Sequence, residues 1–206
     1  MKAGIQTSAP TDASPLVSVI IASYNHAPYI EASIHSVLAQ TYPHIELLVV
    51  DDGSSDDSVA LIARLQKLHG FDFRAQVNQG LSRTLNEAIG RAQGELIVPF
   101  GSDDIMRPQR IAAQVEYLQD KPEVGICAAN VEIIDDQGQP LPDSQQSQRD
   151  LPFRRLDFDD LFLDRKPGPM VATQMFRSEA LVRVGGFYPH IALVDVYICL
   201  MILVSG

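Results

Sequence analysis

Short apolar segments alternate along this chain with segments whose apolar residues recur at helical spacing. The apolar segments are residues 16–23, 45–50 and 96–100, and residues 71–77, which are less apolar, are expected to form a further strand. Most are rich in β-branched residues, which is typical of buried strands. Strands and helices that alternate through short turns require a parallel sheet with right-handed crossovers. We therefore predict an α/β fold with a mostly parallel central sheet flanked by helices.

Two of the predicted strands end in adjacent aspartates, Asp51-Asp52 and Asp103-Asp104. Like charges side by side repel each other and lose solvation when crowded, so they rarely stabilise a fold. Either Asp103 or Asp104 could instead cap the helix that follows. In open α/β sheets, however, ligands bind outside the carboxyl ends of the strands, and both pairs fall at that edge. The coincidence favours a site for a divalent cation or a polyhydroxy ligand.

The regular alternation stops after residue 141. Residues 145–162 are polar and hard to assign, and we predict a loop over the site. The other elements expected in this half are strands at 124–129 and 170–176 and a hairpin at 133–141. We therefore expect this half of the chain to form a smaller part of the fold with mixed strands and helices.

Serines stand near the predicted starts of several helices. Ser54 and Asp57 have the spacing of a capping box, although Asp replaces the usual Glu or Gln. Ser82 and Ser178 are expected to cap the helices that follow them. Residues 54–57 are thus interpreted as structural, which leaves Asp51 and Asp52 to be explained separately.

The composition is that of a globular protein, with 46% hydrophobic and 20% charged residues in 206. The net charge of −10 argues against a nucleic-acid partner, because such proteins hold phosphates with lysine and arginine. The two cysteines, Cys127 and Cys199, lie in apolar surroundings and predict buried thiols in a reducing compartment. We therefore expect a cytoplasmic protein.

The two ends of the chain differ in character. Residues 1–15 are polar and small and are predicted to form a disordered tail, and they do not resemble a signal peptide. The longest apolar run, residues 196–204, is far shorter than the roughly 20 residues that cross a bilayer. Because this run stops directly before Ser205-Gly206, we expect the natural protein to continue beyond it.

An ordered set of motifs resembles the family 2 glycosyltransferases with the GT-A fold. The likeness runs from Leu16 almost to the end of the chain. The motifs are residues 17–25, 36–42, 49–56, 78–80, 86–89 and 101–104, together with the glycine turn at 185–187. The resemblance implies a domain at residues 16–206, with a nucleotide-binding half at 16–104 and an acceptor half at 105–206.

The resemblance also implies roles for the nucleotide-side residues. Ala22 and Tyr24 would flank the base, and Asp52 would accept a hydrogen bond from it. Asp103 would contact the ribose or the sugar and stand beside the metal. Asp104 would ligate Mg²⁺ or Mn²⁺, hard cations that prefer oxygen and leave room for substrate phosphates. The metal would neutralise the departing diphosphate.

Asp195 is the candidate general base for the acceptor hydroxyl. Inverting members of the family use an aspartate in a Glu-Asp motif near the end of the domain, and the matching pair here is Val194-Asp195. An aspartate in this apolar run would be desolvated, which raises its proton affinity. The alternative is an aspartate that caps the final helix.

Two further departures from the family pattern concern the donor side. Gly101 replaces the first aspartate of the common Asp-x-Asp-Asp string, and Leu85 replaces an arginine before Asn86. Arg83 lies nearby and could reach a phosphate, although a solvated surface arginine is the commoner case. The histidines do not show the spacing of a ligand set and are interpreted as surface or core residues.

The implied function is transfer of a sugar from a nucleoside-diphosphate donor, with UDP-sugars favoured, to a hydroxyl acceptor with inversion. The acceptor would be a glycan or a lipid-linked glycan of a bacterial surface polysaccharide or lipopolysaccharide. The enzyme could then lie at the inner face of the membrane as a peripheral protein. Two alternatives are a catalytically degenerate nucleotide-sugar-binding module and a receiver-like signalling domain, whose acidic pocket resembles residues 49–52.

Overall fold

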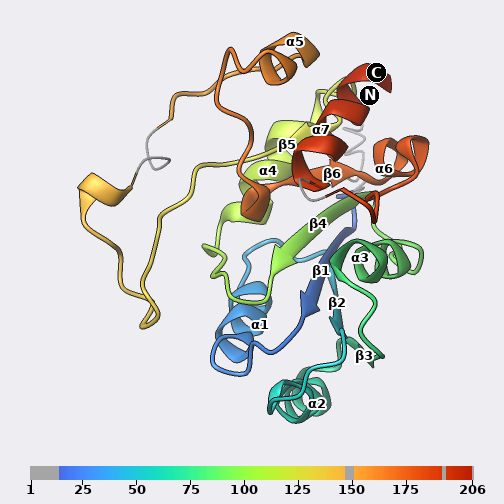
Figure 1. Cartoon of the computed structure of the whole chain (residues 1–206), viewed down its shortest axis with the longest axis vertical. Helices are drawn as coiled ribbons and strands as arrows, with labels where there is room; N and C mark the ends of the chain where they lie inside the picture. The colour runs from blue at the N-terminus through green and yellow to red at the C-terminus, as the bar shows by residue number, and fades with distance from the viewer. Residues whose placement is uncertain (1–13, 147–150, 192–193, 206) are drawn as a thin grey trace, which may run out of the picture.

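A single mixed sheet organises the protein, as the computed structural model in Figure 1 shows for residues 14–146, 151–191 and 194–205. The strand order is β3-β2-β1-β4-β6-β5, and the first four strands are mutually parallel. β6 runs antiparallel to β4, and β5 antiparallel to β6. The strands are β1 (Val17–Ser23), β2 (Ile45–Asp51), β3 (Asp72–Ala75), β4 (Leu96–Gly101), β5 (Ile126–Cys127) and β6 (Met175–Arg177). The predicted α/β class with a mostly parallel sheet is confirmed.

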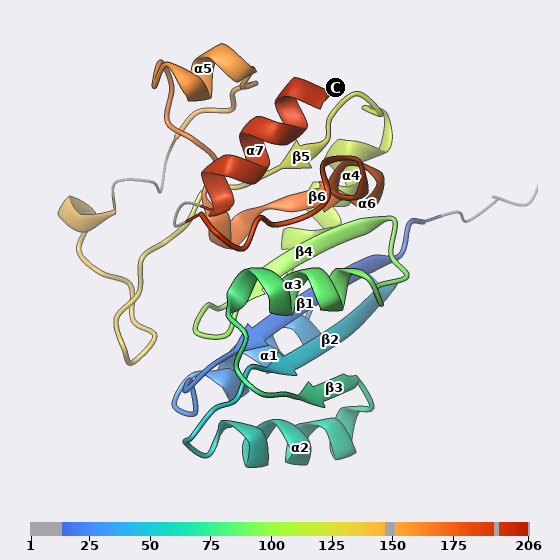
Figure 2. The same cartoon turned by 45° about the vertical axis from the view of Figure 1, so that its right-hand side comes forward.

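Helices cover both faces of this sheet (Figure 2). Alternate residues of β1 point to opposite faces, so Val19 and Ile21 pack with α1, α2 and α4, while Ile20 packs with α3, α6 and α7. Because both faces are buried, the central strands are almost continuously apolar. The helices are α1 (Ile30–Leu38), α2 (Ser58–His69), α3 (Leu81–Ile89), α4 (Arg110–Gln119), α5 (Phe158–Phe162), α6 (Ser178–Val184) and α7 (Val194–Ser205).

The helix starts differ from the capping predictions. α2 begins at Ser58, and the hydroxyl of Ser54 donates to Asp51 Oδ2 at 2.6 Å instead of capping the helix. Ser82 lies inside α3, whose N-cap is Gly80, and Ser178 is the first residue of α6 and makes no cap bond. These three predictions are wrong: Asp51 takes the hydroxyl of Ser54, and Ser82 and Ser178 lie inside their helices, past the N-cap position.

The strands of the second half are shorter than predicted. Residues 171–173 form a short 3-10 helix that precedes β6, and β5 retains two residues. The hydroxyl of Thr173 accepts from Ala129 N at 3.0 Å and donates to Ala129 O at 2.8 Å. Side-chain bonds therefore replace the strand ladder at this point. A bridge between Ile134 and Pro140 confirms the hairpin.

The predicted loop at 145–162 contains the short helix α5 at residues 158–162, and a 3-10 turn (Asp143–Gln145) ends at the loop's first residue. Asp157 and Asp160 form a capping box at the N-terminus of α5. In the described ranges no helix is long and apolar enough to cross a membrane. The predicted tail lies outside those ranges except for Ser14 and Pro15. Cys199 is buried and Cys127 half-buried, and both are free thiols, as expected.

Candidate functional site

The two aspartate pairs flank the end of one strand. In the parallel pairing, Ser23 at the end of β1 lies opposite Asp51 of β2. On its other side, Ala22 of β1 lies opposite Gly101 of β4. The loops after β1, β2 and β4 therefore meet at one sheet edge, as predicted. The strand order also differs from the flavodoxin-type order of receiver domains, so the receiver alternative is wrong.

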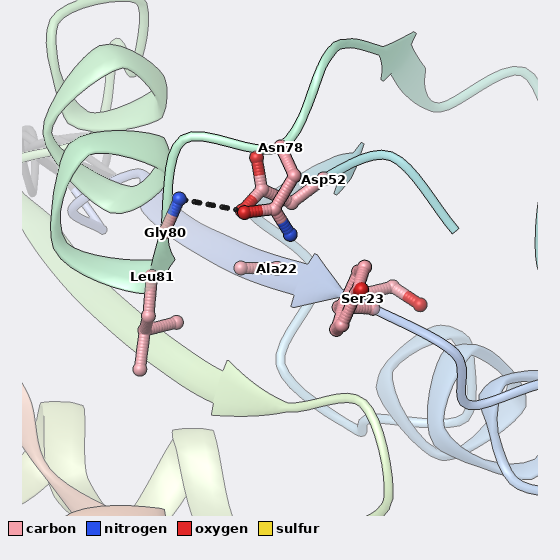
Figure 3. Close-up of a pocket in the computed structure, with 7 residues that line it drawn as sticks. Ala22, Ser23, Asp52, Asn78, Gly80 and Leu81 are labelled. Atoms are coloured by element: carbon pink, nitrogen blue, oxygen red, sulfur yellow. Dashed lines mark hydrogen bonds between the residues drawn. The ribbon is translucent and has the colours of Figure 1, made fainter. Parts of the chain in front are cut away.

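A pocket of about 190 Å³ opens at this edge (Figure 3). It unites three of the predicted nucleotide-binding residues, which come from the end of β1 and the end of β2. The rest of the lining comes mainly from the turn before α3 and from the first residue of that helix. The lining residues are Ala22, Ser23, Tyr24, Asp52, Asn78, Gly80 and Leu81. Tyr24 is half exposed, so its ring is available to stack on a planar ligand.

Asp52 shapes the pocket by holding the turn that precedes α3. Its Oδ1 accepts from Gln79 N at 3.0 Å and from Gln76 Nε2 at 2.9 Å. Its Oδ2 accepts from Gly80 N at 2.9 Å, the bond drawn in Figure 3. Burial alone would raise the pKa of Asp52, but the hydrogen bonds from Gln76, Gln79 and Gly80, with Thr84, outweigh it and lower the pKa. Asp52 is therefore a buried, ionised acceptor at neutral pH.

Asp51 has a structural role that separates it from its neighbour. It is fully buried and accepts from Ser54 N at 2.8 Å and from Ser54 Oγ at 2.6 Å. These bonds close the turn between β2 and α2. A buried carboxylate is retained here because hydrogen bonds satisfy it.

The carboxylates of Asp103 and Asp104 converge over Gly101. A Cβ at position 101 would lie 2.4 Å from Asp104 Oδ2 and 3.1 Å from Asp103 Oδ1. The absence of a side chain at Gly101 thus gives Asp104 the space that it occupies. Burial, reinforced by the negative charge of Asp103, raises the pKa of Asp104, and the positive charge of Arg110 opposes this rise.

Arg110 is a half-buried cation next to this pair. Its guanidinium donates to Ala172 O at 2.9 Å and to Gln114 Oε1 at 3.0 Å, and lies over the Phe100 ring at 5.6 Å. Burial lowers the pKa of Arg110 to about 10, and the nearby Asp104 carboxylate works against this fall. Arg110 is thus fixed by protein contacts and partly compensates the acidic pair.

The donor set fits a hard divalent cation. Two carboxylates approach the same point, and each gains from a cation because each raises the energy of the other. Within the described ranges no group of three or more His, Cys, Asp or Glu side chains could hold a metal. Mg²⁺ and Mn²⁺ are hard cations suited to oxygen ligands, and Mg²⁺ typically binds one or two carboxylates together with substrate phosphates and water. Asp104 and Asp103 would therefore hold such an ion together with a diphosphate.

Asp195 lies in the first turn of α7 and is half-buried. Asp195 and Cys199 are four residues apart on α7, so they lie on the same face of the helix. Burial, with the negative charge of Asp195, raises the pKa of the Cys199 thiol to about 12. Cys199 Sγ also accepts from Gln174 Nε2 at 3.4 Å, and Gln174 O accepts from Arg110 Nη2 at 3.4 Å. Because Gln174 precedes β6, which is antiparallel to β4, α7 begins toward the edge where β4 ends (Figure 2).

Arg83 is separate from this arrangement. Its side chain is exposed on α3 and does not line the pocket. Sequence reasoning gave no site role to Gln76, His26 or Arg110. Gln76 bonds to Asp52 and His26 bonds to Ser102 of the acidic loop, while the charge of Arg110 acts on Asp104. Only Arg110 carried a signal, as a basic residue six positions after Asp104 on the next helix.

Comparison with known proteins identifies the family. The family model for glycosyl transferase family 2 matches residues 18–184. The chain belongs to this family.

A family 2 relative is the putative teichuronic acid biosynthesis glycosyltransferase TuaG of Bacillus subtilis, 37% identical over 116 residues. The match covers 54% of this chain and 45% of TuaG, so the chain spans less than half the length of that relative.

Two solved structures show the same fold. The mannosyltransferase PcManGT from Pyrobaculum calidifontis, in complex with GDP-Man and Mn²⁺, superposes with a TM-score of 0.70 at 23% identity, over 93% of this chain and 52% of PcManGT. S. aureus TarS 1–349 in complex with UDP superposes with a TM-score of 0.72 at 18% identity, over 92% of this chain and 55% of TarS. The predicted GT-A fold is thereby confirmed.

Proposed function

We propose that this chain is the catalytic domain of an inverting glycosyltransferase that uses a nucleoside-diphosphate sugar. The observation that carries the proposal is the adjacency of the Asp52 pocket and the Asp103-Asp104 pair at one sheet edge. A pocket with an aromatic wall suits a base, and a neighbouring carboxylate pair suits a cation that binds diphosphate. Residues 16–104 form the nucleotide-binding half and residues 105–206 the acceptor half.

The nucleobase of the donor must present an N–H group at the edge that faces Asp52. An ionised carboxylate offers only acceptor oxygens, and the lowered pKa keeps Asp52 ionised. Uracil carries an imide N–H, whereas cytosine has an acceptor at the same ring position. Guanine and thymine also carry a ring N–H, so this argument disfavours only cytosine. Among the remaining donors we favour UDP-sugars, with Tyr24 and Ala22 on the faces of the base and Asp103 at the ribose or sugar. TarS is solved with UDP, which supports this choice.

Asp104 and Asp103 would hold Mg²⁺ or Mn²⁺, which supplies Lewis-acid stabilisation of the leaving diphosphate when bound. The structure of PcManGT with Mn²⁺ supports a metal of this class. The protein contributes a rigid carboxylate pair, because Arg110 lies beside Asp104 and is itself fixed by Ala172 O and Gln114. Arg83, exposed on α3, is a candidate for an outer phosphate contact.

Asp195 is the proposed general base. It would take the proton from the acceptor hydroxyl while that oxygen attacks the anomeric carbon, and the carbon–oxygen bond to the diphosphate breaks on the opposite face. Configuration at the anomeric carbon is thereby inverted. The position of α7, which begins toward the edge where β4 ends, supports this role.

The acceptor is a glycan or lipid-linked glycan of the bacterial cell surface, as the similarity to the putative teichuronic acid enzyme supports. Such an acceptor is assembled at the inner face of the membrane, so we infer a cytoplasmic, peripherally associated enzyme.

Thermal unfolding in the presence of nucleotides tests the donor side. UDP, GDP, CDP and dTDP are each added with and without Mn²⁺ to the wild type and to Asp104→Ala. At about a hundredfold excess over Kd, binding stabilises by roughly 2.7 kcal/mol. In a domain of this size that raises Tm by roughly 5–10 °C. A metal-dependent shift with UDP that the variant loses is expected, and no shift with any nucleotide contradicts the proposal.

Turnover separates an active enzyme from a module that binds nucleotide sugars without transferring them. Val194 in place of the family's glutamate is the sequence feature that motivates this second candidate. Release of UDP from a UDP-sugar in the presence of acceptor supports the enzyme. Metal-dependent UDP binding without any release supports the binding module.

A further inference from the structure

The turn between β1 and α1, residues 25–27, is bonded through consecutive backbone N–H groups to side chains that follow β2. This pattern joins the loop that carries Tyr24 to the loop that follows Asp52. The three bonds are Asn25 N to Ser54 Oγ at 2.8 Å, His26 N to Ser58 Oγ at 3.2 Å and Ala27 N to Asp56 Oδ2 at 2.9 Å.

Asn25 reinforces this junction through its conformation and its side chain. Its φ of 54° lies in the left-handed region, which asparagine tolerates better than most residues. Its Oδ1 accepts from Ser55 N at 2.8 Å and from Ser55 Oγ at 3.2 Å. A strained conformation persists only where the surroundings fix it. The turn at residues 25–27 is therefore a rigid continuation of the loop whose Tyr24 lines the pocket.

His26 extends the junction to the acidic loop after β4. Its Nδ1 lies 2.6 Å from Ser102 Oγ, a hydrogen bond in either tautomer. Ser102 is buried and directly precedes Asp103 and Asp104. A short contact to a buried hydroxyl restricts the loop at the position from which both carboxylates extend.

Helix α1 holds the two ends of the same loop. Ser33 Oγ donates to Gly101 O at 2.9 Å, and Met106 N donates to Ser36 Oγ at 3.0 Å. Neither these bonds nor the His26 contact uses the carboxylates of Asp103 and Asp104. The loop is thus anchored at three points while its acidic side chains stay available to a ligand.

We propose that His26 is a positioning residue that sets the distance between the base pocket and the metal-binding carboxylates. The proposal rests on the proposed function, because it concerns the metal and nucleotide of that same site. A cation shared by Asp104 and a diphosphate must lie at a defined distance from the bound base. His26 lies two residues after Tyr24 and contacts the residue before Asp103, so it fixes that distance directly. Its side chain therefore supports the metal-dependent part of nucleotide affinity and not the metal-independent part.

Calorimetric titration of the full chain with UDP, in Mn²⁺ and in EDTA, tests this division. His26→Ala is expected to weaken UDP binding about 3- to 10-fold in Mn²⁺, the effect of one lost hydrogen bond, and less than about twofold in EDTA. His26→Asn, which returns a polar atom near Nδ1, is expected to restore most of the affinity. His44→Ala is the matched control, because His44 is exposed at the opposite end of the sheet, where its backbone O accepts from Val17 N.

Ser102→Ala supplies an independent variant should His26→Ala fail to fold. It is expected to weaken binding in Mn²⁺ by the same factor, and the double variant is expected to lose no more than either single variant. Equal losses in Mn²⁺ and EDTA, no loss in Mn²⁺, or additive losses would each overturn the role of His26. A wild type that binds UDP equally in Mn²⁺ and EDTA would instead overturn the metal-dependent function itself.

Discussion

The side-chain amide of Asn86 makes two hydrogen bonds to the backbone of Phe187, which lies 101 residues further along the chain. Asn86 Nδ2 donates to Phe187 O at 2.7 Å, and Phe187 N donates to Asn86 Oδ1 at 2.8 Å. Asn86 lies on α3, whose first residue lines the nucleotide pocket. Phe187 precedes the segment that leads to Asp195. The pair therefore fastens the proposed nucleotide half to the proposed acceptor half.

The glycine turn beside this pair gives a matched test of the contact. Gly185 and Gly186 have φ values of 78° and 77°, but a Cβ at Gly186 would lie 2.4 Å from Asn86 Oδ1, whereas a Cβ at Gly185 meets nothing within 4 Å. Gly185→Ala is expected to lower the free energy of unfolding by about 1–2 kcal/mol, the penalty of a left-handed alanine. Gly186→Ala is expected to lower it further, as measured by urea unfolding. In a double-mutant cycle, the additional loss caused by Gly186→Ala should disappear when Asn86 is also replaced by alanine. Equal losses of unfolding free energy for Gly185→Ala and Gly186→Ala would refute the contact.

A second glycine lies against the carboxylates of the proposed metal site. Gly101→Ala would push a Cβ into Asp104 Oδ2 at 2.4 Å, so we expect weaker Mn²⁺-dependent UDP binding with little change in Tm. Gly90→Ala is the control, since its Cβ meets only ordinary contacts from 3.5 Å and its φ of −62° suits alanine. That variant should bind normally and gain about 0.4–1 kcal/mol of stability. Unchanged metal dependence in Gly101→Ala would argue against the role of Asp104.

Asp104→Asn is expected to preserve or raise the Tm of the metal-free protein. Because burial and Asp103 raise the pKa of Asp104, its ionised form is disfavoured in the folded state. The ionised Asp104 side chain therefore destabilises the folded protein. This loss of stability is absent at a pH below the pKa that Asp104 has in the unfolded chain, and it is complete at a pH above the pKa that it has in the folded protein. Differential scanning calorimetry at neutral pH in EDTA measures this effect. A clear fall in Tm would show that Asp104 is a structural residue.

Asp52→Asn is expected to destabilise the protein at neutral pH by about 1–3 kcal/mol, because an amide places N–H groups against the donors Gln79 N and Gly80 N. The lowered pKa of Asp52 adds stability above its ordinary value of 3.8, and this is lost as the pH falls through the folded pKa. The difference in the free energy of unfolding between the wild type and Asp52→Asn should therefore become smaller at acidic pH. Asp57→Asn, at an exposed position whose side chain makes no cap bond, should show no such pH dependence.

Asp195→Asn is expected to reduce sugar transfer by about 10²–10⁴-fold, the usual contribution of a general base. UDP affinity should remain within about twofold of the wild type, because Asp195 does not line the nucleotide pocket. Release of UDP from the donor measures turnover, and calorimetry measures affinity. Glu179→Gln is the matched control, an exposed acidic residue in the first turn of α6. Full turnover in Asp195→Asn would assign the base to another residue.

The sequence was informative where one local rule dominates. The apolar runs of β1, β2 and β4 are long and β-branched, and tertiary packing buries both faces of the sheet that they form. Aspartates that follow such strands must lie at one edge, so the position of Asp52 and Asp104 followed from topology. The division of labour between Asp51 and Asp52 did not, because it depends on which backbone N–H groups approach each carboxylate.

The specific partners of polar side chains were the part that pattern reasoning missed. Ser54 has the spacing of a helix cap, yet a hydrogen bond to Asp51 takes its hydroxyl. His26 lacks the spacing of a ligand set, yet it contacts Ser102, 76 residues away. Thr173 interrupts a run that reads as strand, because its hydroxyl bonds to both backbone groups of Ala129. Such partners are defined only once the chain is folded.

The most direct test of the central claim is a crystal structure of the protein with UDP and Mn²⁺, with anomalous diffraction to locate the metal. We expect the uracil in the pocket between Tyr24 and Asp52, and one anomalous peak within coordination distance of an Asp104 carboxylate oxygen and of the diphosphate. UDP bound elsewhere, or a manganese peak remote from Asp103 and Asp104, would contradict the account.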